Sequence, residues 1–266
     1  MSTSTPCSVL NSLSPLAGTA PTSDSWLILF QQGAWGERPV ETLVSQDLKI
    51  WAHAHDAKIL LARSPQHVDP HPTSTYWYSN SVGELRQGTL NAEGLPDLRF
   101  TNISSPLLLI CTNGKRDQCC ATFGRNLITQ CKESLAPESF SHILECTHLG
   151  GHRFAPTAIW LPQNLVLGRL DLIAVSTLLD KGEVSPQFVR GSTRLSPAEQ
   201  VVQVFLWPAT PDFQSCQQIN SDFHIEVVID GVAGSFVVAA TDVDSVASCG
   251  AEPKNNTQYS MLNAYS

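Results

Sequence analysis

The sequence predicts an α/β fold that contains more than one structural unit. The chain has 266 residues, of which 42% are hydrophobic, so it is long enough to bury a substantial core. Short apolar runs typical of buried strands alternate with segments of helical periodicity, and the order strand, helix, strand, strand occurs twice. After residue 211, apolar and polar residues alternate, which predicts a separate antiparallel hairpin.

The first half of the chain opens with a predicted strand at residues 26–30, where five apolar residues follow one another. Residues 41–55 carry apolar side chains at i, i+4 and i+8, which is the spacing of one helix face, and predict one helix. Residues 58–62 and 75–78 are short aliphatic or aromatic runs and predict two further strands.

The same order of elements returns after residue 103. We expect a strand ending at Ile110, a helix over residues 117–134, and strands at residues 142–146, 158–161 and 165–169. This recurrence is typical of a divergent duplication, although the sequence identity between the halves is slight.

The last third of the chain begins with a helix expected at residues 170–179. Ser196, Pro197 and Glu199 have the spacing of an N-cap, a first helical residue and a capping box, so they predict a helix that ends near Trp207. Residues 224–229 and 235–239 flank an Asp-Gly turn and predict a β-hairpin. The polar tail from Cys249 onward is expected to be frayed.

The charge of the chain argues against a nucleic-acid partner. The formal net charge is -8, and no cluster of Lys and Arg supplies the basic face that phosphate binding requires. No apolar run approaches the ~20 residues of a membrane span, so no membrane partner is expected either.

The chain start lacks both the basic and the apolar segment of a secretory leader, which predicts a cytoplasmic protein. Thiols stay reduced in that compartment. The eight cysteines therefore indicate metal ligands better than they indicate a disulfide framework.

Two pairs of metal-binding side chains stand out, Cys111 with Cys120 and His148 with His152. Each pair follows a predicted buried strand and lies in a glycine-containing loop, so two strand ends can meet around one metal centre. Asp117 is a candidate N-cap for the following helix, whose first turn would then favour thiolates at Cys119 and Cys120.

The chemistry of these residues leaves three interpretations open. Two cysteines and two histidines suit structural zinc, an iron–sulfur cluster, or loops that bind no metal. Cys119 is an alternative to Cys120, and Cys146, two residues before His148 on the same strand face, is an alternative ligand. Cys7, Cys131, Cys216 and Cys249 are expected to be structural.

The longer motifs around these residues resemble the sucrase/ferredoxin-like family. The central motifs are Cys-Thr-x-Gly-x-Arg-Asp-x-Cys-Cys at residues 111–120, Phe-Gly-Arg at 123–125, His-Leu-Gly-Gly-His-Arg-Phe-Ala-Pro at 148–156 and Gly-Arg-Leu-Asp at 168–171. Supporting matches are Leu-Ala-Gly-Thr-Ala at 16–20, Ser-Trp at 25–26, Val-Arg-Gly at 189–191 and Ser-Cys-Gly at 248–250.

The resemblance implies a thioredoxin-like ferredoxin with a 2Fe-2S cluster, in which histidines replace two of the usual cysteines. It assigns Cys111 and Cys120 to one iron and His148 and His152 to the other. It also implies a ferredoxin domain over residues 103–210, preceded by a degenerate thioredoxin-like segment over 1–102 and followed by a hairpin extension over 211–266.

The function expected from this ligand set is electron transfer or redox sensing without an enzymatic substrate. Neutral imidazoles remove negative charge from the cluster, which raises its reduction potential, and their outer nitrogens can couple the electron to a proton. The expected partner is an unidentified redox protein or reductase.

Two other function classes remain open. A zinc-stabilised interaction module would use the same four ligands. A thiol oxidoreductase would normally need a Cys-x-x-Cys motif, which the chain lacks. No paired-carboxylate motif supports glycoside hydrolysis, the other activity that the family name suggests.

Overall fold

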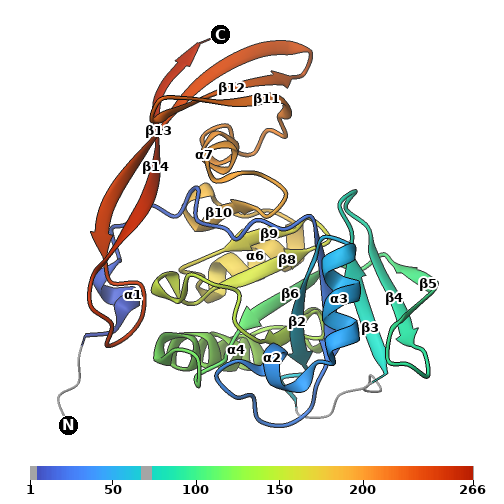
Figure 1. Ribbon diagram of the computed structural model, residues 1–266. Coiled ribbons are helices and arrows are strands. Elements are labelled where there is room, and N and C mark those ends of the chain that lie inside the picture. The colour runs from blue at the N-terminus through green and yellow to red at the C-terminus, as the bar shows by residue number, and fades with distance from the viewer. Residues whose placement is uncertain (1–4, 67–73, 266) are drawn as a thin grey trace.

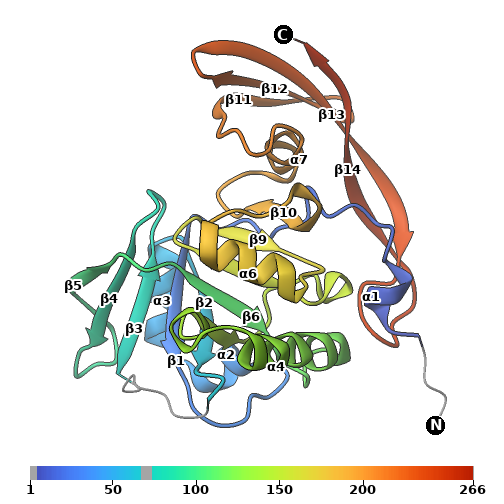
Figure 2. The same cartoon turned by 180° about the vertical axis from the view of Figure 1, so that it is seen from behind.

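A ten-stranded mixed sheet forms the larger part of the molecule, and a four-stranded antiparallel sheet lies beside it (Figures 1 and 2). The computed structural model describes residues 5–66 and 74–265. The strand order of the large sheet is β10-β9-β8-β6-β7-β2-β1-β3-β4-β5. Helices pack on this sheet, so the predicted α/β class is confirmed at this level.

The N-terminal half of the large sheet is built around β1 (Ser25–Phe30), whose six residues are all buried. Strand β1 pairs in parallel with β2 (Ala57–Arg63) and antiparallel with β3 (Thr75–Ser79). Two further strands, β4 (Leu85–Leu90) and β5 (Pro96–Ile103), extend the sheet from β3. Both escaped prediction because polar residues and a glycine interrupt their apolar pattern.

The single helix predicted at residues 41–55 is wrong. The segment forms two helices, α2 (Pro39–Leu43) and α3 (Gln46–Ala54). Val44 between them is extended, with φ −101° and ψ 134°, and Ser45 starts the second helix by accepting a hydrogen bond from the Leu48 N–H at 3.2 Å. The first helix ends before Ser45, and Ser45 is the N-cap of a second helix. The apolar periodicity continues across this break, so it predicted one helix instead of two.

The C-terminal half of the large sheet repeats the pairings of the first half. Strand β6 (Leu107–Cys111) pairs in parallel with β7 (Ile143–Cys146) and antiparallel with β8 (Ala158–Leu161). Strand β9 (Leu165–Leu167) then pairs antiparallel with β8, as β4 does with β3. Strand β10 (Val189–Ser192) pairs antiparallel with β9. The order of elements predicted twice from the sequence is therefore present twice in the fold.

The two halves join through antiparallel pairing of β2 with β7, where Ala62 faces Cys146 and Arg63 faces Glu145. Arg63 Nη2 lies 2.6 Å from Glu145 Oε2, and this ion pair is nearly buried. The seam covers the edge of β7, the strand that leads to His148. The first half thus supports the strand that positions one of the candidate ligands.

Around β6, the hydrophobic core of the described chain forms two clusters, one on each face of the large sheet. Leu108 and Ile110 of β6 pack under α4 (Arg125–Ser134) and α6 (Leu172–Lys181). On the opposite face, Leu107, Leu109 and Cys111 join a core to which β1, β2 and β3 of the first half also contribute. The alternation along β6 therefore sends Cys111 toward the side where the two halves meet.

The smaller sheet contains β11 (Asp212–Ile219), β12 (Asp222–Ile229), β13 (Val232–Ser245) and β14 (Lys254–Tyr265) in that order. The predicted hairpin is confirmed, and its turn residues Asp230 and Gly231 have positive φ angles of 51° and 81°. Helix α7 (Pro197–Phe205), which has the predicted capping box at Ser196, packs against this sheet.

The prediction of a frayed tail from Cys249 onward is wrong, because β14 pairs along the length of β13. The polar residues of β14 concealed a strand whose partner supplies the hydrogen bonds. The connection between β13 and β14 lies against α1 (Cys7–Leu10) in both views (Figures 1 and 2). Asn11 Nδ2 donates to the Val246 carbonyl oxygen at 2.9 Å across this contact.

Among the helices of residues 5–66 and 74–265, none is long and apolar enough to cross a membrane. The domain boundaries expected at residues 102 and 210 stay predictions.

Candidate metal centre

Three of the four predicted ligands come together at the end of the β6–β7 pair. Cys111 ends β6, Cys120 begins the π-helical turn η1 (Cys120–Gly124), and His148 follows β7. Their sulfur atoms and a ring nitrogen of His148 all lie within 4.8 Å of one another. The two predicted strand ends therefore meet.

The π-helical turn brings Cys120 close to Cys111. A π turn widens the start of the helix locally, and such turns are frequent at functional sites. Gly124 ends the turn directly against the Cys111 backbone, where an added Cβ atom would collide with the Cys111 carbonyl oxygen. A glycine is required there for the helix to approach β6.

Asp117 caps this helix, as predicted: its Oδ1 accepts a hydrogen bond from the Cys119 N–H at 2.8 Å. The capped turn holds Cys119 and Cys120 at successive positions, so their side chains point in different directions. Cys120 lies with Cys111 and His148, whereas Cys119 lies with Cys7 and Cys249. The structure thus places Cys120, and not its neighbour, beside Cys111.

His152 is buried in the short helix η2 (His152–Phe154), outside the compact group of three. The ring centroids of His148 and His152 are 5.0 Å apart. His152 Nε2 lies 2.7 Å from Ser248 Oγ and 3.5 Å from Asp117 Oδ2. The fourth predicted ligand therefore borders the group, and its outer nitrogen contacts residues from two other parts of the chain.

The Nδ1 atoms of both histidines are buried without a hydrogen-bond partner among the described residues. A buried nitrogen of this kind is costly unless something satisfies it. Because a carboxylate and a hydroxyl face His152 Nε2, the proton of the neutral ring is favoured on Nε2, and Nδ1 is left with a free lone pair. Two thiols, the adjacent His148 ring and the bordering His152 ring form a donor set that fits a metal centre.

The electrostatics of the thiol pair favour one thiolate. A hydrogen bond from Cys120, together with His148 nearby, holds the pKa of Cys111 well below its usual value. The same hydrogen bond and burial raise the pKa of Cys120. Burial lowers the pKa of His152, although the Asp117 carboxylate opposes this shift. These shifts favour the thiolate form of Cys111 and the neutral form of the His152 ring.

Cys146, the alternative ligand on β7, is paired in register with Cys111 and is completely buried. Burial raises its pKa, so it stays a neutral thiol. It belongs to the hydrophobic core between the two halves and not to the compact group.

A buried arginine of the Val-Arg-Gly motif at residues 189–191 supports the histidine loop. Arg190 is 2% exposed, and its Nη1 donates to the Gly150 carbonyl oxygen at 2.9 Å while its Nε donates to Thr19 Oγ1 at 3.0 Å. Burial lowers the pKa of Arg190 to about 9. The guanidinium lies directly against Gly151, whose φ is +71° and whose missing Cβ atom leaves the necessary space.

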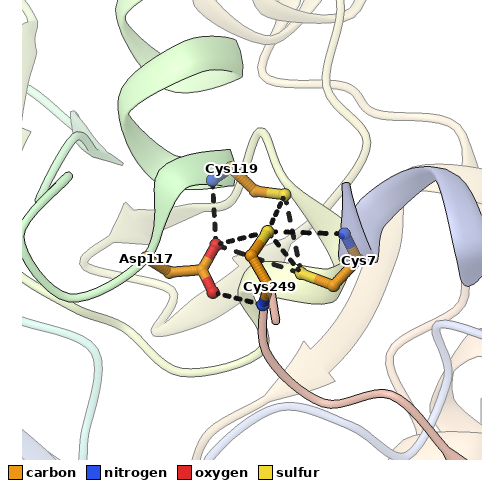
Figure 3. A group of neighbouring side chains, drawn as sticks. All are labelled: Cys7, Asp117, Cys119 and Cys249. Atoms are coloured by element: carbon orange, nitrogen blue, oxygen red, sulfur yellow. Dashed lines mark hydrogen bonds between the residues drawn. The ribbon is translucent and has the colours of Figure 1, made fainter. Parts of the chain in front are cut away.

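A second group of side chains, not anticipated from the sequence, lies on the other side of Asp117. It consists of Cys7, Asp117, Cys119 and Cys249 (Figure 3). Cys7 and Cys249 were expected to be structural cysteines, and the fold brings them together with Cys119. Three cysteines so far apart in the chain carry no spacing signal, so only the tertiary structure reveals the group.

Comparison with known proteins supports the resemblance found in the motifs. The family model described as sucrase/ferredoxin-like matches residues 16–191, which is more than half of the chain. Neither the curated proteins nor the solved structures include a significant match. The matched region contains all four predicted ligands, and we conclude that the chain belongs to the sucrase/ferredoxin-like family.

Proposed function

We propose that this protein is an electron-transfer or redox-sensing protein whose 2Fe-2S cluster is bound by Cys111, Cys120, His148 and His152. The observation that carries the proposal is the compact group of Cys111, Cys120 and His148, bordered by His152, in which both histidine Nδ1 atoms are buried without a hydrogen-bond partner among the described residues. Bound there, the cluster would take up and release one electron at a time.

Each protein residue has a distinct role in this proposal. Cys111 and Cys120 supply the negative charge, and the two histidines supply neutral nitrogen ligands. Asp117 and Ser248 hold the proton on His152 Nε2, which fixes the ring orientation as outer partners of metal-bound histidines commonly do. Arg190 fixes the backbone of the loop between the histidines.

The topology supports a thioredoxin-like interpretation of both halves. In each half, a parallel strand pair bridged by helix is followed by two antiparallel strands on the opposite side. We propose that the first half is a degenerate copy whose present role is to support β7 through the seam at Arg63 and Glu145.

A redox partner would approach from the His148 side. His148 is partly exposed and lines an open pocket of about 400 Å³ together with Glu37, Arg38 and Arg116. Because electrons pass most readily over short distances, this pocket is the expected contact for an unidentified redox protein or reductase. No separate substrate site is required, so we propose a carrier and not an enzyme. All eight cysteines are free, which supports a reducing, cytoplasmic setting.

One observation favours a second candidate, a zinc-stabilised module at the same residues. Cys111, Cys120 and His148 form a set compact enough for a single ion, whereas His152 lies outside it. Zinc binds such mixed sulfur and nitrogen sets. The two candidates predict different metal contents and different colours.

The test is metal analysis of the full chain purified without oxygen. We expect two irons and two acid-labile sulfides per chain, a reddish-brown colour, and an electron paramagnetic resonance signal after reduction by dithionite. A colourless protein that contains no iron, with zinc lost on Cys111→Ser substitution, would establish the zinc module instead.

A further inference from the structure

The three cysteines of the second group form a nearly equilateral triangle. The sulfur–sulfur distances are 3.5 Å between Cys7 and Cys119, 3.2 Å between Cys119 and Cys249, and 3.5 Å between Cys7 and Cys249. All three are free thiols. Figure 3 shows their side chains converging from α1, from the start of the α4 region and from the loop before β14.

Asp117 adds an oxygen to this triangle. Its Oδ1 lies 3.5 Å from Cys249 Sγ and 3.9 Å from Cys7 Sγ, and the Asp117 side chain is buried. Backbone N–H groups fix its orientation, since Cys119 donates to Oδ1 and Cys249 donates to Oδ2 at 3.0 Å. The carboxylate is thus positioned by the same residues whose sulfur atoms it faces.

Hydrogen-bond donors point at the sulfur atoms from outside the triangle. The Cys7 N–H lies 3.4 Å from Cys249 Sγ, and Ser8 Oγ lies 3.3 Å from Cys119 Sγ. Donors directed at sulfur stabilise thiolates, and metal–thiolate sites commonly have such an outer shell. Three thiolates and a carboxylate within this small volume would repel one another unless a cation lay between them.

Hydrophobic packing provides little reason for the three segments to meet. Among the described residues, the buried apolar cluster around the triangle contains Cys7, Cys119 and Ala155, with Phe123, Val246 and Cys249 partly buried beside them. Residues 7 and 249 are separated by 242 positions, so their approach closes a very long loop. A metal ion can supply the energy that so small a core does not.

We propose that Cys7, Cys119 and Cys249, with Asp117 as the fourth ligand, bind a single zinc ion that anchors the β13–β14 connection to the N-terminal helix. Three thiolates and one carboxylate oxygen form a closed tetrahedral set for Zn²⁺, the arrangement of a structural site. With zinc–sulfur bonds of about 2.3 Å, tetrahedral ligands lie roughly 3.8 Å apart, so the sulfurs need to separate by roughly 0.3–0.6 Å.

The short distances distinguish this site from an iron–sulfur cluster. In a cluster, each cysteine binds a different iron or shares one with a single other cysteine, so three sulfurs cannot lie this close together. A disulfide would join two of the three thiols and leave the third unused, together with the carboxylate. A single ion uses all four side chains.

This site also touches the proposed redox centre through two links. Asp117 Oδ2 lies 3.5 Å from His152 Nε2, and Ser248, adjacent to Cys249, lies 2.7 Å from the same nitrogen. This consequence rests on the proposed function: the zinc ion would fix the segment that contacts a cluster ligand. The zinc site itself does not depend on which metal His152 binds.

The test measures zinc and iron in the full-length protein purified without oxygen in the presence of a reductant. We expect wild type to contain one zinc per chain that Cys249→Ser and Cys7→Ser lose, while both variants keep their iron. Cys216→Ser is the matched control, because that half-buried thiol of β11 lies outside both groups and should retain both metals. Cys111→Ser should show the reverse pattern, with loss of iron and retention of zinc.

Cobalt binding provides a second measurement, whose main result comes from the wild-type protein and does not depend on how well a variant folds. Zinc-free wild type titrated with Co²⁺ should develop the absorption of a tetrahedral thiolate site. Cys249→Ser should lose at least about one third of the sulfur-to-cobalt intensity, because one of three thiolates is missing, and all of it where the variant no longer binds the metal. Wild type without zinc or cobalt binding would overturn the proposal. It would equally be overturned by a disulfide in the anaerobic protein, or by zinc that leaves with Cys111→Ser but not with Cys249→Ser. Failure of the redox proposal would appear separately, as absence of iron.

Discussion

His152 Nε2 lies 2.7 Å from Ser248 Oγ, although the two residues are 96 positions apart in the chain. Ser248 belongs to the connection between β13 and β14, which reaches back from the smaller sheet to the candidate metal centre. The hydroxyl and Asp117 together face the outer nitrogen of the ring. The C-terminal segment therefore contributes directly to the surroundings of a predicted ligand.

The first prediction concerns that contact. Ser248→Ala removes the hydroxyl that orients His152, and loss of an outer partner of this kind typically lowers metal affinity by ~10–100-fold. We expect iron to leave the variant faster than wild type when a chelator is added, measured by the decay of visible absorption. Ser176→Ala on the exposed side of α6 is the control and should decay at the wild-type rate. Equal decay of all three proteins would show that Ser248 has no part in holding the ligand.

The second prediction separates the adjacent cysteines. Cys120→Ser and Cys111→Ser should each lose most of the visible absorption, because each thiolate supplies charge and a strong bond to iron. Cys119→Ser and Cys131→Ser should retain it, since Cys119 faces the second group and Cys131 is a core-facing residue of α4. A full spectrum in Cys120→Ser, combined with its loss in Cys119→Ser, would contradict this assignment.

The third prediction tests the histidines as ligands. Conversion of His148 and His152 together to cysteine should preserve a 2Fe-2S centre but lower its reduction potential by roughly 200 mV or more, because two negative charges are added to the cluster. Potentiometric titration of both proteins measures the difference. An unchanged potential would mean that the histidines do not bind the metal.

The fourth prediction concerns pH. If the outer nitrogen of a histidine gains proton affinity when the centre is reduced, its pKa is higher in the reduced form than in the oxidised form. The proton then accompanies the electron between these two pKa values, so the potential should fall as pH rises, by about 59 mV per pH unit for one proton per electron. The double cysteine variant should have no such slope. A wild-type potential that is constant from pH 6 to 10 would exclude proton coupling.

The fifth prediction concerns the glycine against Arg190. Gly151→Ala places a methyl group against the buried guanidinium and also adopts an unfavourable φ of +71°. Gly182→Ala is a matched control, because Gly182 has the same φ and nothing lies within 4 Å of the added atom. The left-handed conformation costs about 1–2 kcal/mol at both sites, and overpacking adds about 1–3 kcal/mol at Gly151 alone. Urea denaturation should therefore show a larger loss of unfolding free energy for Gly151→Ala, and similar losses would argue that Arg190 can move aside.

The sequence by itself determined the elements whose signals are local. The apolar runs of β1, β6 and β8, the capping box at Ser196 and the Asp-Gly turn at 230–231 are all present as predicted. The motif spacing also identified Cys111, Cys120 and His148 as neighbours before their geometry was known. In each case, the signal that predicts the element or the ligand lies in a short stretch of sequence or in one strand followed by its loop.

Tertiary structure decided what depends on contacts distant in the chain. Strand β14 is polar and forms because β13 offers it a long row of hydrogen-bond partners, interrupted by one bulge between Val237 and Val238. Arg190 supports the histidine loop because β10 places its guanidinium against Gly150 and Gly151. This contact joins segments about 40 positions apart, so no local pattern in the sequence predicts it. The meeting of Cys7, Cys119 and Cys249 has the same origin, because no local pattern encodes an approach that three separate segments make only when the whole chain has folded.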